Sequence, residues 1–214
     1  MGGARRHPIF AFVYPLTVRL GERSVGPRRA RLLATAQGTV VEIGAGTGVN
    51  FPYYPPGVVV AATEVEPGLV RKARRAAARS PSIEVIAASA DALPFSDGAV
   101  DTVVSTAVLC TVPDLAAALE EVRRVLKPSG RLLFLEHVRS DDPKLADKQD
   151  RGERRQMRLA AGCHPNRDTV AAIAAAGFEL EQVDRFDLPG PKLTRPGVSG
   201  SARDRSAITD GRAR

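Results

Sequence analysis

Three glycines stand at alternate positions directly after a short apolar run, in the stretch VVEIGAGTG at residues 40–48. A strand followed by a glycine-rich turn and a helix lets a ligand approach backbone N–H groups without side-chain obstruction. Glu42 precedes Gly44 by two residues, and Glu64 ends the next apolar run. Carboxylates accept hydrogen bonds from a ribose diol and attract positive charge, but they repel a pyrophosphate. These residues therefore predict a site for a ligand with ribose hydroxyls and a cationic amino-acid end.

The spacing of the glycines separates the nucleotide-like ligands from one another. A dinucleotide site requires G-x-G-x-x-G, whereas Gly44, Gly46 and Gly48 give G-x-G-x-G, with Val49 where the third glycine should fall. The phosphate-binding pattern G-x-x-x-x-G-K-[ST] does not occur in the sequence. S-adenosylmethionine has an adenosine, a sulfonium and an ammonium, so it is the cofactor we expect.

The elements that would position these residues alternate along the chain from Thr39 onward. Short β-branched runs alternate with helical patterns, which is typical of βαβ units, and the runs are almost continuously apolar, as in a sheet covered on both faces. We expect strands at 39–43, 58–64, 83–88, 100–106, 131–137 and 178–188, and a weak one near 197–202. We expect helices at 67–80, from Asp114 to the KPSG stretch at 127–130, and at 166–176 with Asn166 as N-cap. The charged stretch 139–158 is expected to be an exposed helix or loop at the carboxyl edge of the sheet.

The length of 214 residues suits one domain with a full core. We expect residues 39–189 to form that domain. Residues 1–38 would form a helical lid or extension, and residues 190–214 the weak final strand and a flexible basic tail that is disordered from Arg203.

The formal net charge of +7 could indicate a nucleic-acid partner. The excess lies at the ends, however: residues 1–38 carry +6 and residues 190–214 carry +4, which leaves −3 on residues 39–189. A nucleic-acid groove would belong to the folded face that carries the ligand site. We therefore interpret the ends as solvated tails and expect no nucleic-acid partner, with a nucleic-acid or anionic-membrane contact as the alternative.

The two cysteines, Cys110 and Cys163, have no metal-ligand spacing and form no disulfide framework. No metal site is expected, and a reducing compartment, the cytoplasm, is the default. The apolar stretch IFAFVYPLTV at 9–18 contains Pro15 and lacks the small-residue cleavage site of a signal peptide. It could instead contact a membrane surface peripherally.

Four motifs occur in a fixed order: VVEIGAGTG, an acid at the end of the second strand, SADALPFSDGAVDTVVS and VRRVLKPSGRLLFLEH. Together they resemble the class I S-adenosylmethionine-dependent methyltransferases over about residues 39–189. The resemblance implies a doubly wound α/β fold, with a seven-stranded, mostly parallel sheet, helices on both faces and an antiparallel last strand.

Four further stretches, GAGTGVNFPYYP, TAVLCTVPD, FLEHVRS and GCHPNRDT, are similar to bacterial relatives of the thiol S-methyltransferases, the methyltransferase-like seven family. Animal members of that family act on small alkyl thiols and are membrane-anchored. This chain departs from them in having no N-terminal span of membrane length. It also carries the arginine-rich stretch QDRGERRQMRL at 149–159, which we expect to line the acceptor pocket.

The resemblance also implies which residues contact the cofactor. Glu42 would receive the ammonium, directly or through water, and Glu64 would accept both ribose hydroxyls, while Glu66 would cap the following helix. Asp91 would accept from the adenine amino group. The full set of expected cofactor contacts is Glu42, Gly44, Ala45, Gly46, Gly48, Glu64, Val65, Ala90, Asp91, Ala92, Thr106 and Ala107.

For a thiol acceptor the thiolate is the nucleophile, so a nearby base or positive field is useful. His137, at the end of the fifth expected strand, and His164, before the third helix, are the candidate catalytic residues. For each of them the alternative is a structural histidine bonded to backbone.

Three tyrosines could shape the site. Tyr14 could close over the cofactor as a lid, and Tyr53 and Tyr54 could line the entrance; the alternative is apolar packing with a hydrated hydroxyl. Cys110 and Cys163 are interpreted as small buried hydrophobes, although Cys110 follows the fourth strand closely.

The function that these observations favour is methyl transfer to a small-molecule acceptor such as an apolar thiol, amine or hydroxyl. Lipid or quinone methylation is an alternative, which the apolar N-terminal stretch would suit. A non-catalytic protein that binds S-adenosylmethionine is another. The sequence does not indicate an oligomeric state.

Overall fold

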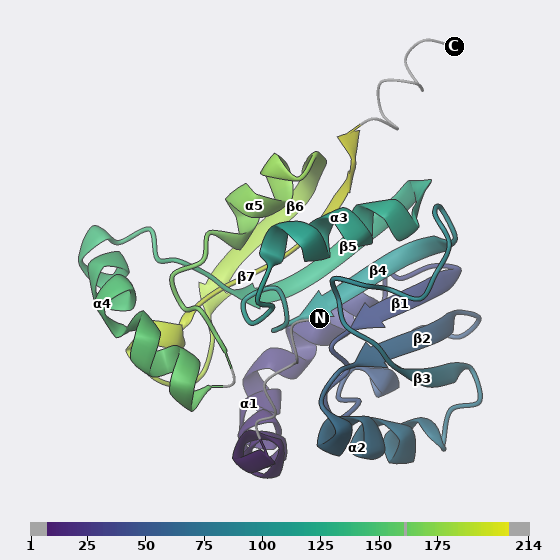
Figure 1. Ribbon diagram of the computed structural model, residues 1–214, viewed down its shortest axis with the longest axis horizontal. Helices are drawn as coiled ribbons and strands as arrows, with labels where there is room; N and C mark the ends of the chain where they lie inside the picture. The colour runs from purple at the N-terminus through teal and green to yellow at the C-terminus, as the bar shows by residue number, and fades with distance from the viewer. Residues whose placement is uncertain (1–7, 161, 206–214) are drawn as a thin grey trace.

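The computed structural model describes residues 8–160 and 162–205, with the backbone alone for residues 8–20. Their strands form one seven-stranded sheet in the order β3-β2-β1-β4-β5-β7-β6 (Figure 1). Strand β7 is antiparallel to both of its neighbours, and the pairs among β1 to β5 are parallel. The expected doubly wound α/β fold is therefore confirmed. The strands are β1 Thr39–Ile43, β2 Val59–Glu64, β3 Ile83–Ala87, β4 Val100–Thr106, β5 Leu126–His137, β6 Phe178–Asp187 and β7 Pro196–Asp204.

Helices cover both faces of this sheet. Leu33 and the inner side of α2 pack on the face that includes Val104 and Leu133, whereas α3 and α5 pack on the face that includes Val103 and Phe134. Successive strand residues thus enter opposite cores, as the period of a strand requires. The helices in the described part of the chain are α1 Pro8–Leu33, α2 Pro67–Ala77, α3 Leu115–Val125, α4 Pro143–Leu159 and α5 Thr169–Ala175, with short 3-10 turns η1 Phe51–Tyr53 and η2 Lys192–Thr194.

The helix caps agree with the sequence in two cases and differ in one. Asp114 caps α3 by accepting from the Ala117 N–H at 3.0 Å, and Glu66 caps α2 by accepting from Gly68 N–H at 3.3 Å. The expectation that Asn166 caps α5 is wrong: Asp168 does so, accepting from Ala171 N–H at 3.0 Å. Asn166 instead donates to Asp150 of α4, so a tertiary contact has displaced a local one.

The final strand is stronger than its composition suggests. β7 lies between β5 and β6 and pairs with both along its length, so Gly and Ser are tolerated there because backbone bonds are made on both sides. It extends to Asp204, whose carboxylate accepts two hydrogen bonds from Arg123 of α3. The expectation of disorder from Arg203 is therefore wrong for residues 203 and 204, and residues 206–214 lie outside the described part of the chain.

Helix α4 stands off the carboxyl edge of the sheet, at the left of Figure 1. Gln149 anchors it: this side chain is fully buried, its Nε2 group lies 2.8 to 3.2 Å from the carbonyls of Val138, Pro165 and Leu193, and its Oε1 accepts from Ser140 N–H at 2.8 Å. The stretch 139–158 is thus mainly a helix held at the rim. Its arginines at 151, 154, 155 and 158 are exposed, and the expectation that the stretch 149–159 lines the acceptor pocket stays a prediction.

Candidate cofactor and acceptor site

The turn after β1 is built on glycines in the left-handed conformation. Gly44, Gly46 and Gly48 have φ angles of 62°, 59° and 79°, a region that other residues rarely adopt. Gly44 also has no room for a side chain, since a Cβ there would lie 2.4 Å from Cγ2 of Val108. The buried Ala45 donates its N–H to Thr63 of β2 at 2.8 Å. The turn is therefore fixed between the end of β2 and the segment after β4.

Glu64 ties this turn to the start of α2. Its Oε2 accepts from Gly46 N–H at 2.8 Å, and its Oε1 accepts from the N–H groups of Val65 and Glu66 at 2.9 Å each. A carboxylate oxygen can accept two hydrogen bonds, so Oε2 retains capacity for a hydroxyl donor. The side chain of Val65 is half exposed beside it. This arrangement suits the ribose contact that was expected of Glu64. It also shows that Glu64 holds the glycine turn against the start of α2.

Glu42 lies at the centre of a buried polar network. It is 1% exposed, and its two carboxylate oxygens accept hydrogen bonds from Asn50 Nδ2 and Tyr54 Oη, each at 2.8 Å. Burial raises the pKa of Glu42 to about 7, although the Asn50 and Tyr54 hydrogen bonds and the nearby Arg29 charge oppose this rise. Asn50 Nδ2 also donates to Thr106 Oγ1 at 3.0 Å, which joins β1 to the end of β4.

The network continues into the N-terminal helix. Arg29 of α1 is 7% exposed and donates through Nη1 to Asn50 Oδ1, while its Nε donates to Glu22 Oε1 at 3.2 Å. Tyr53 Oη donates to the same Glu22 oxygen at 2.9 Å. The hydroxyls of Tyr53 and Tyr54 are thus bonded to carboxylates rather than hydrated. The side chain of Tyr14 lies outside the described residues, so its expected role as a lid stays a prediction.

The turn after β3 carries the expected adenine contact. Ala92 N–H donates to Ser89 O at 3.2 Å, which closes a tight turn with Asp91 near its tip. Asp91 is exposed, Ala90 is half-buried, and Asp91 forms no side-chain hydrogen bond with another described residue. This exposed position after β3 is compatible with the expected adenine contact, which stays a prediction.

The segment after β4 is shaped by a residue that the sequence did not single out. Glu136 of β5 is fully buried, and its carboxylate accepts from Ser105 Oγ at 2.6 Å and from three consecutive N–H groups, those of residues 108, 109 and 110, at 3.1 to 3.2 Å. Ala107, just before these groups, has a φ of 58°, which is strained for a residue with a side chain. The Glu136 carboxylate therefore offsets the strain by binding the turned backbone.

A cluster of reactive groups lies against this segment. His164 N–H donates to Cys110 O at 2.8 Å, Arg167 Nη1 donates to Leu109 O at 2.7 Å, and Cys110 and Cys163 are both free and buried here. His164 Nδ1 lies 2.7 Å from Glu153 Oε1 of α4. Because a carboxylate accepts, Nδ1 is assigned the proton in this contact, and in that tautomer Nε2 is the nitrogen left to accept. The cluster combines a base, a cation and two thiols.

His137, the other candidate base, belongs to a different environment. It follows Glu136 in β5, and successive strand residues point to opposite faces, so the two side chains diverge. Its Nδ1 donates to Thr194 O at 2.7 Å, and burial lowers its pKa, so the ring is neutral. The structure therefore joins His164, and not His137, to the segment after β4. This hydrogen bond to a backbone carbonyl agrees with the alternative interpretation of His137 as a structural histidine.

The residues at the carboxyl edge fit S-adenosylmethionine. The glycine turn presents backbone, and Glu42, Glu64 and Asp91 supply acceptors for a cation, a diol and an amino group at the ends of three adjacent parallel strands. Two clefts of about 590 and 630 Å³ lie elsewhere, one beside α3 and α5 and the other between α4 and the ends of β5 and β6. Neither contains a residue expected to bind the cofactor.

The described ranges, 8–160 and 162–205, bear on a metal site and on a membrane span. There, no three His, Cys, Asp or Glu side chains are arranged to hold a metal ion. In the same ranges, none of the helices has the length and apolarity needed to cross a membrane.

Comparison with known proteins places these features in a family. Residues 41–134 match the family described as a methyltransferase domain. The chain is 32% identical over 181 residues to thiol S-methyltransferase TMT1A of Homo sapiens, a match that covers 77% of this chain and 70% of that protein. It is 34% identical over 151 residues to thiol S-methyltransferase TMT1B of Rattus norvegicus, covering 68% of this chain and 62% of the relative, so it spans less than two thirds of that protein.

Solved structures agree on the fold. An S-adenosylmethionine-dependent methyltransferase from Thermotoga maritima superposes with a TM-score of 0.69 at 20% identity, over 92% of this chain and 98% of that one. At this identity the likeness concerns the fold alone.

Proposed function

Because the chain belongs to the class I S-adenosylmethionine-dependent methyltransferases, we propose that it transfers the cofactor's methyl group to the sulfur of a small apolar thiol. The observation that carries this proposal is the placement of His164 and Arg167 against residues 107–112, the segment that follows β4. The thiol S-methyltransferase relatives support the same acceptor.

The cofactor half of the site is defined here as the turn 44–48 with the ends of β1, β2 and β3. When bound, the cofactor supplies an electrophilic methyl group on a sulfonium. Glu64 would hold the ribose hydroxyls and Asp91 the adenine amino group. Glu42, enclosed by Asn50 and Tyr54, would act on the ammonium through its negative charge or through a shared water rather than by an exposed contact.

The acceptor half of the site is defined as residues 107–112, the segment 162–169 and α4. A thiol becomes nucleophilic when it loses its proton. His164 would take that proton at Nε2, while its Nδ1–H remains directed at the Glu153 carboxylate, which stabilises the resulting imidazolium. The Arg167 guanidinium is partly buried, and its positive charge favours the thiolate over the thiol.

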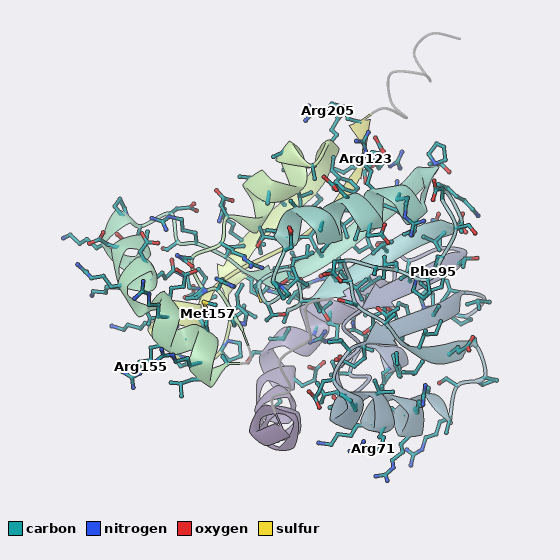
Figure 2. All side chains as sticks on the ribbon, viewed as in Figure 1. Arg71, Phe95, Arg123, Arg155, Met157 and Arg205 are labelled. Atoms are coloured by element: carbon teal, nitrogen blue, oxygen red, sulfur yellow. The ribbon has the colours of Figure 1, made fainter. Side chains whose placement is uncertain are left out.

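Helix α4 sets the size and polarity of an acceptor. Figure 2 shows Met157 on the side of α4 that faces the sheet and Arg155 on the opposite side. Ala146 and Gln149 are buried along the inner side, and Gln149 is fully engaged with backbone. The inner side of α4 thus carries apolar as well as polar groups, and Ala146 and Met157 are the apolar ones that would face a small alkyl thiol. Holding such an acceptor in line with the methyl group can itself lower the barrier by about 7 to 11 kcal/mol.

The test is a turnover assay with methyl-labelled cofactor over a small alkyl thiol, an amine and a quinol. We expect a thioether from the thiol. His164→Gln should lower kcat by about a hundredfold or more, since a general base contributes at least that much. The cofactor dissociation constant should stay unchanged, because His164 makes no contact with the cofactor half.

The matched control is Arg155→Gln on the outer side of α4, which should turn over as the wild type does. Methylation of the amine or quinol without any thioether would contradict the thiol assignment. Tight cofactor binding with no methylated product from any acceptor would favour a non-catalytic binding protein.

A further inference from the structure

The two cysteines of the chain meet in the acceptor half. Cys110 lies in the segment after β4 and is 1% exposed, whereas Cys163 lies between α4 and α5 and is 6% exposed. They are the only cysteines among the 214 residues. Both are free thiols, and the backbone N–H of His164, the residue after Cys163, donates to Cys110 O, so the two cysteines lie on adjoining segments.

Hydrogen bonds hold the segments of the two cysteines together. His164 N–H donates to Cys110 O at 2.8 Å, which fixes the residue before His164 next to Cys110. On the same stretch, Arg167 donates to Leu109 O at 2.7 Å, so the two segments are joined on both sides of the thiols. A disulfide needs neighbouring Cα atoms and converging Cβ vectors, and the two hydrogen bonds bring the backbones of the two cysteine segments together, as the first of these conditions requires.

The two thiols differ in reactivity. Interaction with the Cys110 thiol lowers the pKa of Cys163, and the Arg167 charge adds to this effect, while burial and the Glu136 charge oppose it. The neighbouring Cys163 thiol, together with complete burial and the nearby Glu136 carboxylate, raises the pKa of Cys110. Cys163 is therefore the thiolate that reacts first, and Cys110 is the thiol that follows.

We propose that Cys110 and Cys163 are a reversible redox-modification site that forms an intrachain disulfide. The oxidant is a small hydroperoxide such as hydrogen peroxide, which is close to water in size and can reach a slightly exposed sulfur. The Cys163 thiolate attacks one peroxide oxygen, an S–O bond forms, the O–O bond breaks, and the hydroxide that leaves takes the proton released by Cys163 to become water.

The second step closes the pair. The Cys110 sulfur attacks the sulfenic sulfur of Cys163 as it loses its proton; the S–S bond forms, the S–O bond breaks, and hydroxide leaves with that proton as a second water. Two thiols are oxidised and one peroxide is reduced to two waters. A dithiol reductant restores both thiols by exchange.

The disulfide would bind residues 107–112 covalently to the segment 162–169. Through the proposed function, which makes these segments the walls of the acceptor half, oxidation is expected to abolish thiol methylation while leaving the cofactor half intact. Existence of the disulfide does not depend on that function, because its detection needs no acceptor.

The experiment treats the reduced full chain with hydrogen peroxide, blocks remaining thiols with N-ethylmaleimide, and measures mass and peptide linkage. We expect both thiols to be lost, the chain to be two hydrogen atoms lighter at monomer mass, one linked peptide pair containing Cys110 and Cys163, and full reversal by dithiothreitol. Cys110→Ser should trap a dimedone-reactive sulfenic acid at Cys163. Cys163→Ser should leave Cys110 reduced.

Two outcomes would overturn the proposal: cysteines that oxidise to separate sulfinic acids, or linkage between two chains instead of within one. The mass and thiol count of the wild type distinguish these outcomes without any variant. The test therefore stays valid even if a serine variant fails to fold. If the disulfide forms but the reduced protein methylates no thiol, the proposed function fails and the redox site stands.

Discussion

The two halves of the carboxyl edge are built by different means. In the cofactor half, the turn that faces the ligand is made by backbone: the glycines, the Ala45 N–H and the three N–H groups that bind Glu64. The deeper Glu42, by contrast, is held there by side chains. In the acceptor half, side chains from distant segments bind backbone. Glu136 holds residues 108–110, Gln149 holds α4, and Arg167 holds Leu109. A turn of the first kind leaves a signature in consecutive residues, whereas the side-chain contacts of the second kind leave none.

The largest effect should come from Glu136, because its removal would break the acceptor half. Glu136→Leu leaves a buried hydroxyl and three backbone N–H groups without their acceptor. Each unsatisfied buried donor costs roughly 1–3 kcal/mol, and partial relaxation reduces the sum. We expect the free energy of unfolding to fall by about 4 kcal/mol, measured by urea denaturation.

Glu136→Gln is the matched variant, since it keeps one acceptor oxygen and should lose about half as much stability. Where this variant is folded, its KM for the acceptor should rise while its cofactor affinity stays near that of the wild type. Equal losses in both affinities would show that the two halves are not separable.

The next largest effect concerns the cofactor half, where the buried Glu42 should make the stability depend on pH. Its folded-state pKa is raised from an ordinary 4.5 to about 7, so between these values the folded protein retains a proton that the unfolded chain has released. The stability that this group contributes is therefore present below about pH 4.5 and is lost as the pH rises to about 7, a loss of up to about 3 kcal/mol. Glu42→Gln should remove this slope.

The measurement is urea denaturation of the wild type and Glu42→Gln from pH 4.5 to pH 8. The variant should be close to the wild type at the acid end and progressively more stable than it toward pH 8, while its cofactor affinity is weaker because the negative charge is gone. Parallel stability curves for the two proteins would mean that Glu42 is ionised over the whole pH range. The hydrogen bonds from Asn50 and Tyr54 would then outweigh the effect of burial on its pKa.

The difference between the halves also explains what could be predicted from the sequence. The strand order along the chain, the glycine turn and Glu64 follow from local patterns, because a β-branched run, a run of glycines and a terminal acid are all visible within a few residues. Those predictions describe the part of the site in which each structural feature is marked by a few consecutive residues.

The residues that were missed have partners far along the chain. Arg29 was counted with the solvated basic N-terminus, yet it is buried and bonded to Asn50. Gln149 stood in a charged stretch with no sign that its amide would bind three carbonyls. Glu136 was adjacent to the chosen His137, and only the period of the strand could have indicated that the two face different sides. Residue type and spacing do not indicate which partners such side chains will have, because the fold brings those partners together from distant parts of the chain.

The smallest effect we expect concerns Glu64, and it tests the half that was predicted best. Its carboxylate already binds Gly46, Val65 and Glu66, so Glu64→Ala would loosen the glycine turn as well as remove the expected acceptor for the ribose. Cofactor affinity measured by calorimetry should fall by more than tenfold, which corresponds to about 1.4 kcal/mol. Glu64→Gln keeps an acceptor oxygen for the backbone but has no charge, so a loss of similar size in both variants would assign the effect to the cofactor contact. A loss confined to Glu64→Ala would assign it to the turn, and an unchanged affinity in both would remove Glu64 from the cofactor site, because backbone alone would then suffice to bind the ribose.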